Sequence, residues 1–205
     1  MSIETPNGVE FSIAAKLYLC SGRLLPPGGG MYFGYPSPTA DKVDNRTLTK
    51  LIGAATVDWL EANRFITLEP GSFKQLLGST PTLLVTAVYS GAPGFSGEFL
   101  EATHWAQTDL VTIFSRLLPR AQAPFIDLLD GISLEFARAG VLTRGGYGAH
   151  GNSWDQAWLA YLLEAWYPEA YDAWQRVQAR ADKAVIERSL MTAVAGAQHT
   201  ERDDD

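Results

Sequence analysis

The chain has 205 residues, which is long enough to bury a hydrophobic core as one domain or at most two small ones. Its net charge of −7 and its charged share of only 19% argue against unspecific binding to nucleic acid, because phosphate contacts need clustered Lys and Arg. The lone cysteine, Cys20, rules out an internal disulfide, and no apolar run reaches the roughly 20 residues that a membrane-crossing helix needs.

The first predicted element is a short, densely apolar segment over residues 11–19. We expect a buried helix that ends near Gly22; a strand is the alternative, because so short a run does not separate the two. Proline and glycine are frequent over residues 26–38, which predicts a loop. This loop carries three aromatic residues that either fold back over the core as a lid or contact a ligand or membrane: Tyr32, Phe33 and Tyr35.

The centre of the predicted fold is a helix from Leu48 to Asn63, where apolar residues recur at helical spacing. Asn45 or Thr47 is the candidate N-cap, because each offers a side-chain oxygen to the free N–H groups of the first turn. Asn63 is the expected left-handed residue at the end of the helix.

A β-hairpin follows this helix. Residues 65–68 predict one strand, Pro70 and Gly71 predict the turn, and residues 82–89 predict the returning strand. A helix followed by a hairpin is the shape of a winged-helix unit.

The middle of the chain predicts three more helices, over residues 98–107, over residues 109–118 and from Pro124 to Gly140. A short strand over residues 141–143 follows the last of them. The segments 59–66 and 135–142 therefore share one plan of helix, stop and apolar strand, which indicates an internal pseudo-repeat.

The remainder is predicted to be helical, with Ser153 as the cap of the next helix, Pro168 at the start of a further one and a last helix around residues 184–194. The helix after Ser153 is apolar nearly all round, which predicts that it is buried and that its aromatic residues belong to the core rather than to a cofactor site. These residues are Trp154, Trp158, Leu159, Tyr161, Leu162, Ala165 and Trp166.

Together these elements predict a mainly α fold: a helical domain with winged-helix-like helix–strand units and one protruding β-hairpin. We expect a single domain over residues 1–198 and an acidic tail over residues 199–205. The start of the chain, Met1 to Glu4, is acidic and shows no secretory signal, so we expect a cytoplasmic protein.

No catalytic centre is predicted, and neither is a cofactor or a metal site. Cys20 lies in an apolar run, where a thiol behaves as a small buried hydrophobe, and the three histidines are far apart. Asp127 and Asp130 share a helical face that we expect to be solvated. The glycine-rich segment 144–151 is either a flexible connector or a weak phosphate-binding loop. We therefore do not expect an enzyme.

The order of elements resembles the Golgi phosphoprotein 3 (GPP34) family, which has many bacterial members. The likeness spans nearly the whole chain, and short motifs in four places carry it: residues 13–19, 51–68, 83–102 and 134–143. They look like the family's opening helix, its glycine-started helix and strand, its hairpin arm with the Pro-Gly break and acidic helix, and its second helix-and-strand. Residues 159–162 also suit the family's late helix.

The resemblance implies peripheral attachment to a membrane through a pocket for the head group of phosphatidylinositol 4-phosphate. In the family, that pocket uses a loop tryptophan and several arginines, and the hairpin mediates self-association. This chain offers Tyr32 in the loop and the cations Arg46 and Arg120 nearby, so these three are the candidate head-group residues. The candidate residues for self-association through the hairpin are Phe65, Ile66, Leu84, Val85 and Val88.

Two functional hypotheses follow. The first is a non-enzymatic peripheral adaptor that meets an anionic lipid head group or a membrane surface. The second is a cytosolic protein–protein interaction module that forms a homo-oligomer through its hairpin and binds no lipid. A nucleic-acid partner is disfavoured, because the helix from Leu48 to Asn63 carries Lys50 as its one cation before the hairpin.

Overall fold

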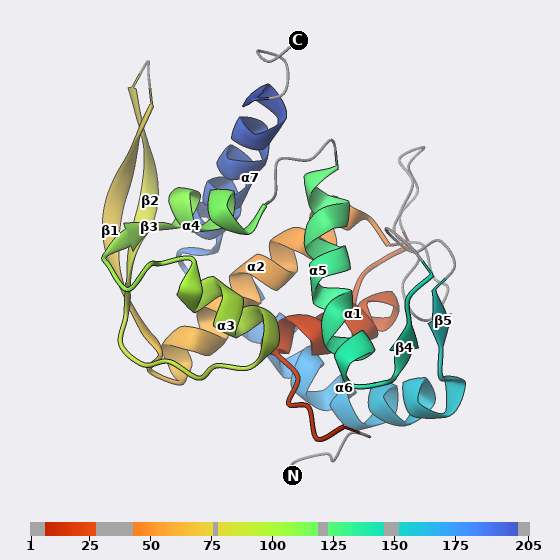
Figure 1. Cartoon of the computed structure of the whole chain (residues 1–205). Coiled ribbons are helices and arrows are strands. Elements are labelled where there is room, and N and C mark those ends of the chain that lie inside the picture. Colours follow the sequence, from red (N-terminus) through yellow and green to blue (C-terminus); the bar gives the residue numbers. More distant parts are fainter. Residues whose placement is uncertain (1–6, 28–42, 76–77, 119–122, 146–151, 201–205) are drawn as a thin grey trace.

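The computed structural model describes residues 7–27, 43–75, 78–118, 123–145 and 152–200 (Figure 1). These residues form a mainly helical protein with one long β-hairpin, which confirms the predicted fold class. The described helices are α1 Ile13–Leu24, α2 Asn45–Ala62, α3 Gly94–Glu101, α4 Leu110–Leu117, α5 Pro124–Arg138, α6 Gln156–Ala179 and α7 Lys183–Thr200. The described strands are β1 Ile66–Gln75, β2 Gly78–Ala87, β3 Thr108–Asp109, β4 Leu142–Thr143 and β5 Ser153–Trp154.

Helix α2 lies at the centre and packs against α1, α5, α6 and α7 (Figure 1). It is buried on nearly all sides, and even Thr49 and Thr56 are inaccessible to solvent. Its N-cap is Asp44, whose carboxylate accepts the backbone N–H of Thr47 at 2.9 Å. The prediction of Asn45 or Thr47 as the cap was therefore wrong: an ionised carboxylate at this position also complements the positive end of the helix.

Helix α2 ends in a Schellman motif. The N–H of Phe65 donates to the carbonyl of Leu60 at 2.8 Å, and the N–H of Arg64 donates to that of Glu61 at 2.9 Å. The left-handed residue is Arg64, with φ 62, while Asn63 has φ −92. The predicted end was thus wrong by one residue, because the hydrogen bond that closes the motif places the turn at the position after Asn63.

Helix α5 ends in the same motif. The N–H of Val141 donates to the carbonyl of Phe136 at 2.9 Å, and that of Gly140 donates to Ala137 at 3.1 Å. Each ending leads into an antiparallel strand pair, β1 with β2 and β4 with β5, as the predicted pseudo-repeat requires.

The hairpin is longer than predicted. Pro70 and Gly71 do not form the turn but lie within β1, where they pair with Leu83 and Thr82 of β2. Strand β1 is at the edge of the sheet, and an edge strand tolerates the missing N–H of proline. Gly71 serves close packing instead, because a Cβ atom there would lie 2.5 Å from the side chain of Leu84.

The hairpin projects from one side of the molecule, with α4 and α7 packed against β2, whereas α1 and α6 lie at the other end (Figure 1). Buried Thr82 of β2 shares a hydrogen bond of 2.9 Å with Ser189 of α7. The hairpin is thereby attached to the helical body mainly along β2, while Ile66 at the start of β1 is also buried in the core.

Helix α6 differs from the prediction in three respects. Ser153 and Trp154 form β5, and Asp155 is the cap, whose carboxylate accepts the N–H groups of Ala157 and Trp158 at 3.0 and 3.1 Å. Pro168 lies inside one helix of 24 residues instead of starting a new one. Packing of α6 against α1 and α2 holds the helix together across the proline.

The expected burial of this helix on all sides was also wrong. Tyr161 is 50% exposed, whereas Leu162 and Trp166 are buried. One face of α6 therefore packs against the core, and the other, with part of its aromatic side chains, meets solvent.

Helix α3 begins at Gly94 and ends at Glu101, well before the predicted end at residue 107. The chain leaves the helical conformation because His104 and Trp105 both have positive φ angles, 52 and 55. Its start is fixed by Glu135 of α5, whose carboxylate accepts the N–H of Phe95 at 2.9 Å.

The same carboxylate of Glu135 also holds the start of α1. It accepts the backbone N–H of Ser12 at 2.9 Å and the Ser12 hydroxyl at 2.7 Å. Burial raises the pKa of Glu135, while the hydrogen bonds from Ser12 and Phe95 oppose that shift. A single buried carboxylate thus joins the starts of two helices to a third.

Asp127 and Asp130 of α5 are buried, so the expectation of a solvated acidic face was wrong. Asp130 forms an ion pair with Arg144, which comes from the segment after β4. The tertiary contact, and not the spacing along α5, decides the environment of these carboxylates.

Candidate functional site

One of the three predicted head-group residues lies within the described structure. Arg46 is exposed on the first turn of α2, whereas Tyr32 and Arg120 lie outside the described residues. The neighbour of Arg46 in the chain, Thr47, lines a cavity. The described part of the predicted site therefore adjoins a concave feature of the molecule.

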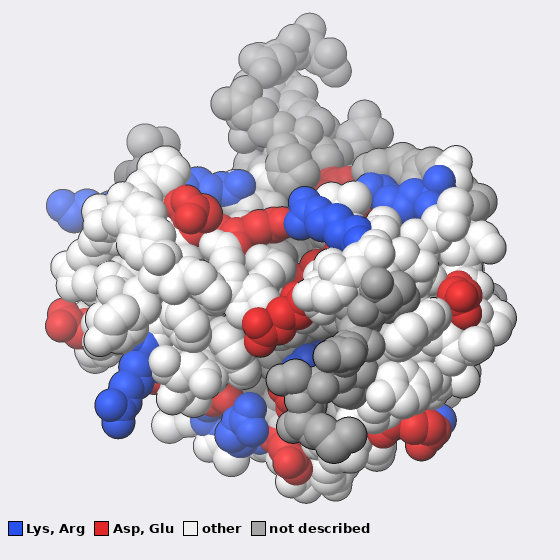
Figure 2. Space-filling model, turned by 60° about the horizontal axis from the view of Figure 1, so that its bottom comes forward, with Lys and Arg blue, Asp and Glu red and all other residues white. Residues whose placement is uncertain are grey.

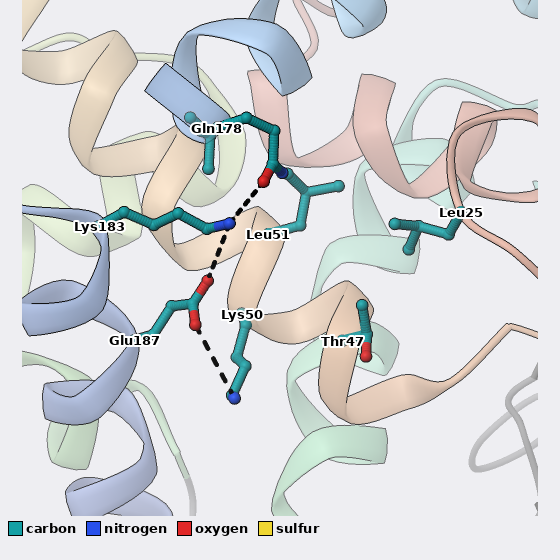
Figure 3. Close-up of a pocket in the computed structure, with 8 residues that line it drawn as sticks. Leu25, Thr47, Lys50, Leu51, Gln178, Lys183 and Glu187 are labelled. Atoms are coloured by element: carbon teal, nitrogen blue, oxygen red, sulfur yellow. Dashed lines mark hydrogen bonds and ion pairs between the residues drawn. The ribbon is translucent and has the colours of Figure 1, made fainter. Parts of the chain in front are cut away.

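This cavity has a volume of about 230 Å³ and lies where α2, the end of α6 and the start of α7 meet (Figure 3). Part of its wall is apolar, with Leu51 and Val177 almost fully buried beneath it. Its described lining residues are Leu25, Thr47, Lys50, Leu51, Val177, Gln178, Lys183 and Glu187.

Two ammonium groups meet one carboxylate in the cavity (Figure 3). The Nζ atom of Lys183 lies 3.6 Å from Oε1 of Glu187, and that of Lys50 lies 3.9 Å from Oε2 of the same residue. Lys183 also donates to the side-chain oxygen of Gln178 at 2.6 Å. Because two cations face one anion, these groups carry one net positive charge.

A network around Arg180 fixes the α6–α7 connection against α2. The guanidinium donates to Asp58 at 3.2 Å and to Glu61 at 2.8 Å, both on α2, and to Asp182 at 2.7 Å. The hydrogen bonds to Asp182 and Glu61 raise the pKa of Arg180, and the hydrogen bond from Arg180 lowers the pKa of Asp182. Since Asp182 directly precedes Lys183, the network also sets the position of Lys183 at the cavity.

The cation Arg46 extends the basic character of the site along α2. Arg46 and Lys50 are four residues apart and therefore share one side of the helix. Lys50 lines the cavity, and Arg46 lies one turn closer to the helix N-terminus, where the helix dipole also favours anions.

This arrangement is better suited to binding a small anion than to catalysing a covalent reaction. Lysine ammonium groups act as point charges toward phosphate or carboxylate. The apolar part of the wall can cover the carbon framework to which such an anion is attached. The volume is below the few hundred Å³ typical of drug-sized pockets, so the cavity fits a charged group and part of its carrier.

The surface of the molecule carries charges of both signs. On the face shown in Figure 2, acidic and basic side chains are interspersed, and much of the described surface is uncharged. Attraction of an anion therefore depends on local geometry, as in the cavity, more than on the net charge of −7.

The remaining candidate groups behave as structural residues. Cys20 is completely buried, and burial raises the pKa of its thiol to about 12, which confirms its prediction as a small hydrophobe. Within the described part of the chain, no three His, Cys, Asp or Glu side chains gather closely enough to hold a metal ion.

The five predicted hairpin residues lie in different environments. Ile66 and Val85 are buried in the protein's own core, and Phe65 stacks on Trp59 with ring centroids 5.5 Å apart. Leu84 is partly buried, whereas Val88 is 46% exposed. Only Val88 of the five presents a large apolar surface to solvent.

Sequence reasoning missed Lys183 and Glu187. Their spacing of four residues on one helix is a signal for a surface ion pair, and Arg46 and Lys50 have the same spacing. Nothing in the spacing shows that α2 and α7 bring Lys50 and Lys183 to one cavity, because that depends on tertiary packing.

No protein-family model matches the chain, and neither does any curated protein or solved structure. Among the described helices, none combines the length and the apolar character that crossing a membrane requires.

Proposed function

We propose that the protein is a non-enzymatic peripheral adaptor that binds the anionic head group of a membrane lipid in the cavity between α2, α6 and α7. The observation that carries this proposal is the meeting of Lys50 and Lys183, from two different helices, in a partly apolar cavity. Two ammonium groups that line one cavity favour a ligand that carries negative charge.

The resemblance to the GPP34 family supports the ligand class, a phosphorylated lipid head group. The residues of α5 disfavour the location that the family uses. In the family, arginines of the pocket lie on the corresponding helix, but here that helix carries Asp127 and Asp130, both buried. Asp130 already uses Arg144 as its ion-pair partner, and residues 126–134 of that helix carry no arginine to receive a phosphate, so the proposed site is at the lysine-lined cavity instead.

The experiment is co-sedimentation with vesicles of phosphatidylcholine alone and with added phosphatidylinositol 4-phosphate, at low and at high salt. We expect binding to the phosphoinositide vesicles that weakens at high salt, because the interaction is electrostatic and partly exposed. The double variant Lys50→Gln/Lys183→Gln should lose it.

A matched control is Arg188→Gln, which removes an exposed cation of α7 that is not among the described lining residues of the cavity. It should bind as the wild type does. Equal loss in the control and in the double variant would point to general charge attraction, and no binding to any anionic vesicle would contradict the proposal.

A second function, an interaction module that self-associates at the hairpin, is favoured by a separate observation. Val88, Tyr89 and Trp105 are 46%, 61% and 50% exposed. Val88 and Tyr89 directly follow β2, and Trp105 comes shortly before β3, so all three lie near the base of the hairpin. Exposed aromatic residues are frequent centres of protein interfaces. Light scattering tests this function: an oligomer that dissociates in a Val88→Ser/Tyr89→Ser variant would support it, and a monomer at high concentration would exclude it.

A further inference from the structure

The carboxylate of Glu187 lies where an anionic ligand of the cavity would bind. Its two oxygens face different lysines, Oε1 toward Lys183 at 3.6 Å and Oε2 toward Lys50 at 3.9 Å (Figure 3). Within the described part of the chain, Glu187 is the one acidic side chain within ion-pair distance of Lys50. The position between the two ammonium groups is therefore already occupied by a negative charge of the protein.

Glu187 is held loosely compared with other acidic side chains of the molecule. Lys16 and Glu169 form an ion pair at 2.8 Å, and Arg176 and Asp58 form one at 2.9 Å, both within hydrogen-bond distance. The two distances from Glu187 to its lysines exceed that range. About a quarter of the Glu187 side chain is exposed, at 26%, so its carboxylate can turn toward water without crossing the core.

From this geometry we infer that Glu187 is an internal competitor of the ligand: its carboxylate occupies the anion position between Lys50 and Lys183 and must move aside when an anionic head group binds. The inference rests on the proposed function of the cavity. An incoming anion gains the attraction of both lysines and is repelled by Glu187 for as long as Glu187 remains near.

The competitor also makes the site selective for charge. A singly charged group, such as the phosphodiester or carboxylate of phosphatidylserine, replaces one negative charge with another and gains little. A phosphate monoester carries close to two negative charges at neutral pH, so it gains more from the two lysines than Glu187 does. Glu187 thus raises the charge that a ligand needs in order to bind.

The test compares the wild type with Glu187→Gln, which keeps the shape of the side chain and removes its charge. Vesicles of phosphatidylcholine carry either phosphatidylserine or phosphatidylinositol 4-phosphate. We expect the variant to bind the phosphoinositide vesicles on the order of tenfold more tightly, because one like charge is removed from a partly exposed site. It should also bind the phosphatidylserine vesicles, with which the wild-type protein does not sediment.

The matched control is Glu169→Gln, which changes the net charge by the same amount but removes an ion pair with Lys16 outside the described lining of the cavity. It should bind both kinds of vesicle as the wild type does. Circular dichroism and thermal unfolding of both variants check that they are folded. Because the ion pairs of Glu187 are long and partly exposed, its replacement should leave the unfolding temperature nearly unchanged.

The outcomes separate the two proposals. Tighter binding by Glu187→Gln than by the wild type, with Glu169→Gln unchanged, supports the competitor. Equal binding by Glu187→Gln and the wild type, with loss in Lys50→Gln/Lys183→Gln, overturns the competitor and leaves the proposed function intact. If no protein binds either vesicle, Glu187→Gln included, both proposals are wrong.

Discussion

Arg64 and Gly140 occupy the same position in two copies of one helix ending. Both residues have left-handed backbone conformations, with φ 62 and 74, and each donates its N–H to the carbonyl three residues earlier. The residue that follows each of them, Phe65 or Val141, accepts a hydrogen bond from the residue just after the partner strand, Val88 or Asp155. The two helix–strand units, α2 with β1 and β2 and α5 with β4 and β5, therefore agree in strand register as well as in helix ending. They agree although β4 and β5 have only two residues each.

The first prediction concerns this pair of positions. Arg64→Gly should stabilise the protein by about 0.5–1 kcal/mol, because an L-residue in the left-handed conformation costs about 1–2 kcal/mol and glycine avoids most of that cost. Arg64 is exposed, so little packing is lost. The free energy of unfolding in urea measures the change.

The matching substitution is Gly140→Ala, which should destabilise by about 1–2 kcal/mol for the same reason. A Cβ atom there would lie 3.4 Å from the side chain of Asn7, so the backbone conformation is the larger part of the cost. Changes of the same sign at both positions would contradict the equivalence of the two helix endings.

The second prediction concerns Glu135. Glu135→Gln should destabilise the protein by about 2–3 kcal/mol, because an amide NH₂ replaces one of two oxygens that accept buried hydrogen bonds. An N–H group of Ser12 or Phe95 is then left without an acceptor. Urea unfolding measures the loss, and Glu101→Gln, at an exposed position on α3, is the control that should change little. A Glu135→Gln variant as stable as the wild type would show that this carboxylate does not hold the two helix starts.

The third prediction concerns two glycines with different surroundings. Gly131→Ala should stabilise by roughly 0.5–1 kcal/mol, because it lies inside α5 and a Cβ atom there meets nothing within 4 Å. Gly71→Ala should destabilise, because its Cβ would approach Leu84 to 2.5 Å and force that side chain off its packing. Thermal unfolding of both variants checks the opposite signs. A neutral Gly71→Ala would mean that the Leu84 side chain can move away from the added Cβ atom without cost.

The fourth prediction concerns acid stability. The hydrogen bond from Arg180 lowers the pKa of Asp182 from its ordinary value of 3.8, so the folded state binds this proton less readily than the unfolded state does. The contribution of this group to the free energy of unfolding is fully present above pH 3.8. It is lost as the pH falls through the lowered pKa of the folded state. Asp182→Asn should therefore cost up to about 1 kcal/mol at neutral pH.

The difference between this variant and the wild type should shrink as the pH falls below 3.8. Urea unfolding of both proteins at several pH values measures it. A difference that stays constant from neutral to acidic pH would contradict an ionic contribution from Asp182.

The sequence predicted the helices best where periodicity and a stop signal agree. Helix α5, with Pro124 at its start and Gly140 just past its end, is the clearest case. The hairpin was predicted too short because Pro70 and Gly71 normally mark a turn. Only the contact with Leu84 shows that Gly71 lies inside a strand.

The candidate site was predictable only in part. Arg46 was predicted as a head-group residue and Lys50 was recognised as the one cation of the predicted central helix, but Lys183 and Glu187 belong to a helix at the far end of the chain. Their meeting with Lys50 depends on tertiary packing, to which the hydrogen bond from Arg180, in the α6–α7 connection, to Asp58 of α2 contributes. Sequence spacing does not encode a contact of this kind between distant elements.

Amine labelling of the protein with and without vesicles that carry phosphatidylinositol 4-phosphate, read by mass spectrometry, tests whether the lysine-lined cavity binds the head group. We expect Lys50 and Lys183 to become protected together when the vesicles are added, while Lys74 on the hairpin, which is exposed, labels at an unchanged rate. Binding of the vesicles with unchanged labelling of Lys50 and Lys183 would place the anion site elsewhere and contradict binding in this cavity.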